Sequence, residues 1–369
     1  DVTATGHRLE HSAGLARCLD ALVLDWRRAR ALAVAHNQAN GAPRHGANGA
    51  PRLGVGIACM WYGIGNTSTS NPSVMRVGLS REGGLTLYSG AIDIGQGSNT
   101  VMAQICAEAL GVPVAALVLV TGDTDRTADA GKTSASRQTF VSGKAVELAA
   151  RDLRARLLRH ANVGEWALVA FERGRVVVRD RGERRVIDLR RLEADINGDV
   201  VVGEGRFDPP TTRLDADGQG VPYATYAFAA QMAEVAVDVA LGTVRVTRVT
   251  AAHDVGRAVN PMLVEGQIHG GIAQGLGMAL MEDYVPGRTE NLHDYLIPTV
   301  GDMPDIVVRL IEEPEPLGPF GAKGIGEPAL IATAPAILGA IQHATGVRPC
   351  ELPVLPHRLR AALKQAGWA

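Results

Sequence analysis

The sequence has few cysteines, and they lie far apart. Only four occur among 369 residues, at Cys18, Cys59, Cys106 and Cys350. They include no CxxC pair, and the ten histidines form no ligand set, so we expect no iron–sulfur or zinc site held by side chains of this chain. The four cysteines are predicted to be buried thiols.

Long apolar runs and strongly charged blocks are also absent. The longest apolar stretches, such as residues 115–120, end well before the roughly 18 residues that a membrane span requires. The formal net charge is only −2, with acids and bases mixed, so we expect no membrane span and no nucleic-acid surface. The chain starts without a basic and then apolar signal region. We expect a cytoplasmic protein, with the periplasm as the alternative.

Several common catalytic motifs are missing as well. The sequence contains no GxGxxG dinucleotide loop, no GxSxG elbow and no HExxH pair. Residues 131–133, Gly-Lys-Thr, resemble the end of a P-loop, but Arg126 stands where that motif requires glycine. A P-loop nucleotide hydrolase therefore remains only a distant alternative.

What the chain does contain is enough apolar sequence for a substantial core, 46% of its residues. Apolar spacing predicts an N-terminal helical segment over residues 1–38, as one or two helices. The repeated Gly and Pro of residues 39–52 predict a flexible linker. We expect a first α+β subdomain over residues 53–230 and a second over residues 231–369.

Apolar periodicity and turn residues predict the order of helices and strands. The predicted strands are residues 53–62, 73–79, 85–94, 114–120, 175–179, 199–207, 232–239, 243–252 and 306–311. The predicted helices after the N-terminal segment are residues 99–110, 141–160, 261–282 and 333–345. Strands and helices alternate and hairpins are present, so we expect the α+β class.

Two loops before predicted helices are candidate anion sites. Residues 91–100 pass through Gly95, Gln96 and Gly97 into a helix N-terminus, where free N–H groups and the Gln96 amide could bind an anion. Residues 122–139 place hydroxyl groups, an amide and an arginine in a loop that could hold a phosphate. The alternatives are an ordinary strand-to-helix turn and a polar loop that caps a helix.

Two further segments are candidates because of their glycines. Each glycine in residues 261–282 costs a helix about 0.5–1 kcal/mol relative to Ala, which indicates close approach of the backbone to another group. Gln267 and Gln274 in that helix are expected to be buried amides that need partners. The alternative is tight helix packing, with the amides bonded to backbone.

Glu327 follows the glycine-rich residues 318–326. Burial among small apolar residues would raise the pKa of Glu327 and suit it to general-base catalysis. The alternative is a solvated glutamate that caps the helix beginning at residue 333.

Taken together and in this order, the segments resemble the molybdenum-cofactor-binding subunit of the xanthine dehydrogenase and aldehyde oxidoreductase family, from about residue 53 to residue 346. The resemblance implies that a molybdopterin dithiolene holds molybdenum, with no metal ligand from this chain. The cytosine dinucleotide form of the cofactor is one alternative. The residues that the resemblance places at the cofactor are Gly95, Gln96, Gly97, Ser134, Ala135, Ser136, Arg137, Gln138, Gln267, Lys323 and Gly324.

The resemblance also implies a reaction. Glu327 would lie beside molybdenum as the general base in the hydroxylation of an aldehyde or an N-heteroaromatic compound, with oxygen derived from water. A non-catalytic structural paralogue of the same subunit is the alternative.

Two loops of the family are missing from this sequence, and their absence predicts partner chains. The family's earlier GGFG-type and FRGFG-type loops do not occur here, so the chain resembles the C-terminal half of a split or cleaved large subunit. A partner chain would supply those loops, with the site at the interface. An iron–sulfur subunit would carry electrons away, and an FAD subunit is common in the family.

Overall fold

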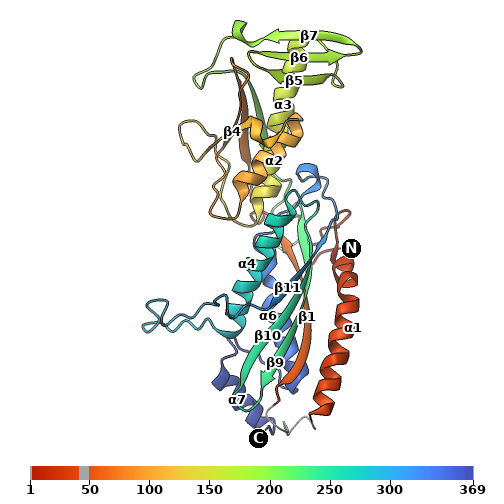
Figure 1. Ribbon diagram of the computed structural model, residues 1–369, viewed down its shortest axis with the longest axis vertical. Helices are drawn as coiled ribbons and strands as arrows, with labels where there is room; N and C mark the ends of the chain where they lie inside the picture. Colours follow the sequence, from red (N-terminus) through yellow and green to blue (C-terminus); the bar gives the residue numbers. More distant parts are fainter. Residues whose placement is uncertain (1, 41–49, 369) are drawn as a thin grey trace. The chain divides into compact units, whose positions relative to one another are not determined.

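The computed structural model describes residues 2–40 and 50–368. These residues form two units, and each is assembled from stretches that lie far apart in the sequence (Figure 1). Unit 1 contains residues 2–12, 63–225 and 314–324. Unit 2 contains the other described residues, namely 13–40, 50–62, 226–313 and 325–368.

This division differs from the contiguous one expected from the sequence. Residues 53–62 belong to unit 2 rather than to the first subdomain, and residues 314–324 belong to unit 1 rather than to the second. The reason is that sheets and loops join segments distant in sequence, which local composition does not reveal. Most of the predicted linker, residues 41–49, lies outside the described residues, so its flexibility remains a prediction.

Unit 1 is built on two sheets, with strand orders β4-β3-β2-β8 and β5-β6-β7. The strands are β2 (Ser73–Ser80), β3 (Leu85–Ser89), β4 (Leu117–Thr121), β5 (Leu168–Glu172), β6 (Arg175–Asp180), β7 (Glu183–Asp188) and β8 (Asp199–Phe207). The helices are α2 (Ser98–Leu110) and α3 (Gly143–Ala161), with a π-helical turn, Gln138–Ser142, before α3. Glycines in β8 let α3 approach closely: a Cβ at Gly203 would lie 2.2 Å from Ala149 O.

Unit 2 is built on one sheet in the order β1-β9-β10-β11. Its strands are β1 (Arg52–Gly63), β9 (Tyr226–Asp238), β10 (Thr243–Asp254) and β11 (Asp305–Ile311). β10 runs antiparallel to β9 and parallel to β11. The helices are α1 (Leu15–Ala39), α4 (Pro261–Leu280), α5 (Pro328–Ile331), α6 (Thr333–Thr345) and α7 (Pro356–Gln365).

The sheet of unit 2 is covered on both faces (Figure 1). Cys18 and Leu22 of α1 pack with Met232 of β9 on one face. Ile272 of α4 and Val235 of β9 belong to the core on the other face. Alternate residues of a strand point to opposite faces, so β9 contributes apolar side chains to both cores.

Most predicted elements are confirmed, and the α+β class is confirmed with them. The strand predicted over residues 85–94 stops at Ser89, and residues 114–120 divide into a 3-10 turn and β4. β5, β7 and α7 were not predicted. Among the residues described, no helix has both the length and the apolar content to cross a membrane.

The prediction of four buried thiols is wrong for two of them. Cys18 and Cys106 are buried, whereas Cys59 and Cys350 are exposed. Cys106 lies on the buried face of α2, and burial raises the pKa of its thiol to about 12.

Candidate active site

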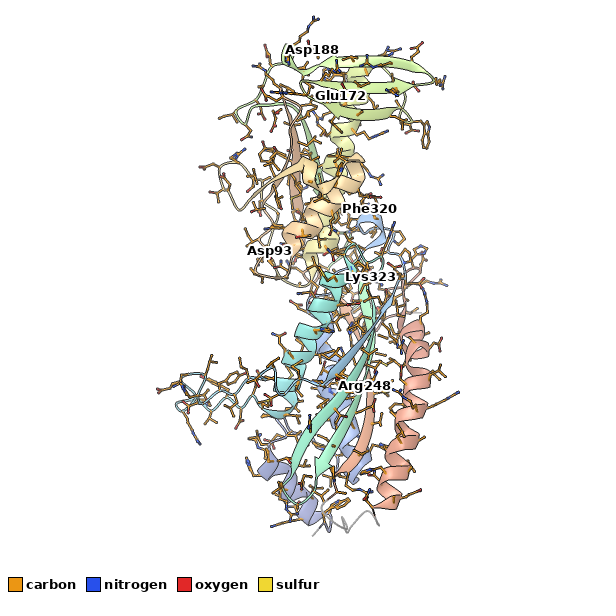
Figure 2. All side chains as sticks on the ribbon, in the orientation of Figure 1. Asp93, Glu172, Asp188, Arg248, Phe320 and Lys323 are labelled. Atoms are coloured by element: carbon orange, nitrogen blue, oxygen red, sulfur yellow. The ribbon has the colours of Figure 1, made fainter. Side chains whose placement is uncertain are left out.

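Asp93 lies in the loop that leads into α2 in unit 1 and binds backbone groups of that loop (Figure 2). One carboxylate oxygen of Asp93 accepts hydrogen bonds from the N–H groups of Gly95, at 2.8 Å, and Gly97, at 3.2 Å, and the other accepts from Asn99 N, at 3.0 Å. Burial acts to raise the pKa of Asp93, but these three donors outweigh it and hold the pKa below its ordinary value. The chain's own carboxylate therefore occupies these N–H groups in this structure, and cofactor contact by Gly95 and Gly97 stays a prediction.

Gln96 is also bonded within this loop. Its Oε1 accepts from Ile94 N at 2.6 Å, and its Nε2 donates to Ile92 O at 3.2 Å and to Ser98 Oγ at 3.1 Å. These bonds fix the orientation of the half-buried amide. Its contact with a cofactor remains a prediction. Gly97, at the N-terminus of α2, has a φ of 84°, a conformation that favours glycine.

Arg137 is fully buried and binds backbone carbonyls. Its Nη1 donates to Ala130 O at 2.6 Å and Lys132 O at 3.0 Å, and its Nη2 donates to Asn71 O at 3.0 Å and Pro72 O at 3.1 Å. Burial lowers the pKa of Arg137, although two nearby aspartates oppose the shift. The guanidinium joins two loops of unit 1. All of its surface is covered by protein, and its contact with a cofactor stays a prediction.

Gln138 leaves one polar atom without a partner. Its Nε2 donates to Thr133 Oγ1 at 2.9 Å and, more weakly, to Lys132 O at 3.4 Å. Thr133 Oγ1 in turn donates to Ile92 O at 2.9 Å, which connects this turn to the Asp93 loop. Gln138 Oε1 is buried and has no hydrogen-bond partner among the described residues. Such an atom marks a place where an N–H donor of a ligand, or a water, would be stabilised.

The turn of Ser134, Ala135 and Ser136 lies against the glycine-rich loop of residues 318–324. Ala135 and Ser136 have positive φ angles of 52° and 53°. A Cβ at Gly324 would lie 1.8 Å from Ser136 O, so only glycine fits at that position. Helical structure begins at Gln138 rather than directly after Lys132 and Thr133, and the P-loop alternative gains no support.

Lys323, in the same loop, is buried (Figure 2). Its Nζ donates to Ser12 O at 2.6 Å. Phe320 has a φ of 50°, and Glu315 Oε2 accepts from Thr225 Oγ1 at 2.6 Å. The ammonium of Lys323 thus joins the N-terminal stretch to this loop. Contact of Lys323 with a cofactor stays a prediction.

Glu327 belongs to unit 2 and is exposed, so the prediction of a buried carboxyl is wrong. Glu327 precedes α5, yet its side chain makes no capping hydrogen bond to that helix, and α6 starts only at Thr333. The alternative of a helix-capping side chain is therefore also wrong. Instead, the hydroxyl of Tyr62, near the end of β1, donates to Glu327 Oε2. No local motif pointed to Tyr62, which is distant in sequence.

The glycines of α4 allow the close approach that the sequence predicted. A Cβ at Gly271 would lie 2.5 Å from Ala329 Cβ, and one at Gly275 would lie 2.4 Å from Thr333 Cβ. Both contacts are with the segment that follows Glu327. α4 therefore packs directly against the turn that carries the candidate base.

The two amides of α4 are less buried than expected. Gln267 is half-buried and Gln274 is exposed, so the prediction of two buried amides is wrong.

The predicted site residues divide between the two units. Unit 1 holds residues 95–97, 134–138, 323 and 324, whereas unit 2 holds Gln267 and Glu327.

Comparison with known proteins defines the class of this chain. The profile described as the molybdopterin cofactor-binding domain matches residues 29–304. The chain belongs to this family. It is 34% identical, over 98% of its length, to the xanthine dehydrogenase molybdenum-binding subunit of Escherichia coli O157:H7, of which it covers 48%. It is 32% identical, over 84% of its length, to the aldehyde oxidoreductase of Megalodesulfovibrio gigas, of which it covers 32%.

Solved structures agree on the fold. The aldehyde oxidoreductase of Desulfovibrio desulfuricans matches with a TM-score of 0.82 and 29% identity, over 98% of this chain and 36% of that one. Quinoline 2-oxidoreductase of Pseudomonas putida 86 shares the fold, with a TM-score of 0.78 and 24% identity, over 99% of this chain and 47% of that one. The chain thus spans about half, or less, of the length of the relatives that it matches.

Proposed function

We propose that this chain is the part of a molybdenum hydroxylase that carries the catalytic base, Glu327. The observation that carries the proposal is an exposed carboxylate on a glycine-rich turn, held by Tyr62, in a chain of the molybdopterin cofactor-binding family. The substrate would be an aldehyde or an N-heteroaromatic compound, and the oxygen added to it would come from water. A carboxylate that reaches the reacting atoms is suited to general-base catalysis.

Two features of unit 1 fit a pterin. Pterins carry N–H and amino groups, and Gln138 Oε1 is a buried acceptor without a partner among the described residues. The missing side chain at Gly324 lets its loop lie directly on the Ser136 backbone, which fixes the turn beside Gln138. We assign cofactor binding to Gln138 and the backbone of Ser134–Ser136. Asp93, Arg137 and Lys323 hold the loops in shape.

The cofactor and the side chains of this chain would supply different parts of the reaction. When bound, the molybdenum cofactor supplies the oxidation of the substrate carbon and takes up its electrons. Glu327 accepts the proton released from the oxygen that is transferred to that carbon. The Tyr62 hydroxyl holds the carboxylate in one orientation, so less orientational freedom is lost when the substrate binds.

We further propose partners for the reaction. Because the chain covers 48% of a xanthine dehydrogenase subunit, another stretch of protein would provide the GGFG-type and FRGFG-type loops. An iron–sulfur subunit would accept the electrons, with an FAD subunit as a further carrier. Two relatives are named as subunits: nicotine 6-hydroxylase large subunit and 6-hydroxypseudooxynicotine dehydrogenase complex subunit gamma, both of Paenarthrobacter nicotinovorans. Their names favour an N-heteroaromatic substrate and a multi-subunit complex.

The test is to purify the complex that contains this chain and to measure molybdenum, pterin and turnover together. We expect stoichiometric molybdenum, with the pterin in its plain or cytosine dinucleotide form. At least one aldehyde, purine or pyridine carboxylate should gain oxygen from isotopically labelled water. An intact, folded complex without molybdenum would overturn the proposal and favour the non-catalytic paralogue.

A further inference from the structure

Beneath the Glu327 turn, unit 2 contains a buried polar side chain in an otherwise apolar strand. Gln231 lies in β9 and is 0% exposed. Its Nε2 donates to Ala329 O at 2.7 Å, and its Oε1 accepts from Thr333 Oγ1 at 2.6 Å. A buried amide destabilises a fold unless it is hydrogen-bonded. Gln231 satisfies this condition by binding two points of one short segment.

That segment is the one that follows Glu327. Ala329 lies within α5, two residues after Glu327, and Thr333 is the first residue of α6. α5 has only four residues, and so short a helix is not stable by itself. Its conformation must therefore be imposed by its neighbours, and Gln231 binds it near both ends.

His253 of β10 extends the same network. Its Nε2 lies 3.0 Å from Gln231 Nε2. Because the amide nitrogen donates both to Ala329 O and toward the ring, His253 Nε2 is the acceptor, and the ring proton is assigned to Nδ1. Burial lowers the pKa of His253 to about 3, so the ring is neutral at neutral pH. A neutral ring can serve as the acceptor that Gln231 requires.

α4 restrains the same segment through its glycines. The Gly271 backbone packs on Ala329 and the Gly275 backbone packs on Thr333, with no room for a Cβ at either glycine. These are the two residues that Gln231 binds from β9. The position of the α5 turn is therefore set jointly by a strand and a helix, both of which are long elements of unit 2.

We propose that Gln231 is a positioning residue that sets the orientation of Glu327 by fixing Ala329 and Thr333. The inference rests on the proposed function of Glu327 as the base. Gln231 itself is covered by protein and acts only through the backbone of the turn. A displacement of a reacting group by about 1 Å can reduce a rate about 10²-fold. We therefore expect a change in kcat with little change in KM.

The experiment uses the molybdenum-loaded complex with Gln231→Leu, which keeps similar volume and removes both hydrogen bonds to the segment after Glu327, as well as the one to His253. Amide hydrogen exchange over residues 328–333 should be at least about tenfold faster, because the local opening of the turn costs less free energy. kcat should fall about 10-fold to 100-fold, with molybdenum content unchanged. Gln342→Leu, an exposed amide on α6, is the matched control and should alter neither quantity.

A second pair keeps the test decisive if Gln231→Leu does not fold. Thr333→Val removes the hydroxyl and should show the same two changes to a smaller extent, whereas Thr333→Ser keeps the hydroxyl and should restore wild-type exchange and kcat. If the Val and Ser variants behave alike, or if Gln231→Leu retains wild-type exchange and kcat, the positioning role is wrong.

Glu327→Gln, measured alongside, separates the two proposals. If Glu327→Gln turns over at the wild-type rate, the proposed base is wrong, and the positioning role falls with it. If Glu327→Gln is inactive while Gln231→Leu is fully active, only the positioning role is wrong. Hydrogen exchange reports on the link between Gln231 and α5 without any dependence on activity.

Discussion

The loops of residues 91–100 and 122–139 in unit 1 and the Glu327 turn of unit 2 use their polar residues in opposite ways. In unit 1, the carboxylate of Asp93 binds backbone groups of its own loop, and the guanidinium of Arg137 binds backbone groups of its own loop and of a second one. In unit 2, the polar residue that binds backbone, Gln231, is buried beneath the turn, and the carboxylate of Glu327 is exposed.

A polar residue in a candidate binding segment is therefore not by itself a ligand-binding residue. A charged group that binds several backbone groups, as the Asp93 carboxylate and the Arg137 Nη atoms do, maintains the shape of a loop. An atom that is buried without a partner, such as Gln138 Oε1, or an exposed one, such as the Glu327 carboxylate, is where a ligand can act.

Arg137→Ala should cause the largest loss of stability, about 3–5 kcal/mol, because four backbone carbonyls, two of them in buried hydrogen bonds, lose a charged donor. Urea unfolding of the chain in its complex measures the change. Arg156→Ala is the control, since Arg156 is half-exposed and pairs with Asp152 on α3; it should cost less than about 1 kcal/mol. Equal losses for the two variants would break the comparison, because Arg137 would not be maintaining the loops.

Burial of His253 in unit 2 should make the free energy of unfolding depend on pH. Burial lowers the pKa of His253 in the folded chain to about 3, from the ordinary histidine value of 6.5. Below pH 6.5 the unfolded chain binds a proton at His253 that the folded chain does not bind. The free energy of unfolding therefore has its full value above pH 6.5 and decreases as the pH falls toward 3, by roughly 2 kcal/mol between pH 6.5 and pH 5.

His253→Gln should remove this part of the slope, measured as the free energy of unfolding at several pH values. His269→Gln, at an exposed position of α4, should leave the slope unchanged. If the wild-type chain and His253→Gln have the same slope above pH 5, the ring is not buried in its neutral form.

Asp93→Asn should have a smaller effect on stability, about 1 kcal/mol, comparable to the loss of a helix N-cap. Because the folded pKa of Asp93 is lowered, its contribution is present above the unfolded pKa and is lost as the pH falls through the folded value. The difference between wild type and Asp93→Asn should therefore be constant from pH 8 to pH 5 and shrink below pH 4. Asp125→Asn, at an exposed position in the same unit, should show no such difference.

Gln138→Leu should have the smallest effect on folding, within about 0.5 kcal/mol, because it removes an unpartnered buried oxygen together with two hydrogen bonds. Its effect should instead appear as lower pterin content, measured on the purified complex. Full pterin occupancy with unchanged affinity would show that Gln138 Oε1 does not face the cofactor.

The sequence predicted the elements better than the site. β1, α2 and β9 were identified because their apolar periodicity and their turns are local signals. β7 (Glu183–Asp188) was missed because charged residues fill it, and its sheet pairs short strands with much exposed surface. The division into units was not predictable, because residues 314–324 join a unit whose other stretches end far earlier in the chain.

In the candidate site, the sequence indicated candidate segments but not the contacts that each side chain makes. The burial of Arg137 depends on carbonyls of residues 71 and 72, which no local pattern relates to it. Tyr62 and Gln231 reach the Glu327 turn from separate strands. One signal was present: Gln231 is an amide within the apolar run of β9, and such a residue requires buried partners.

The most direct test of the account measures molybdenum content and the rate of its reduction by substrate in the same preparations of Glu327→Gln and wild type. The amide keeps the shape of the side chain and cannot accept the proton. We expect full molybdenum, an unchanged melting temperature, and reduction slower by about 10²–10⁴-fold or more. Reduction of Glu327→Gln at the wild-type rate, with full molybdenum, would contradict the account and leave this chain with cofactor binding alone.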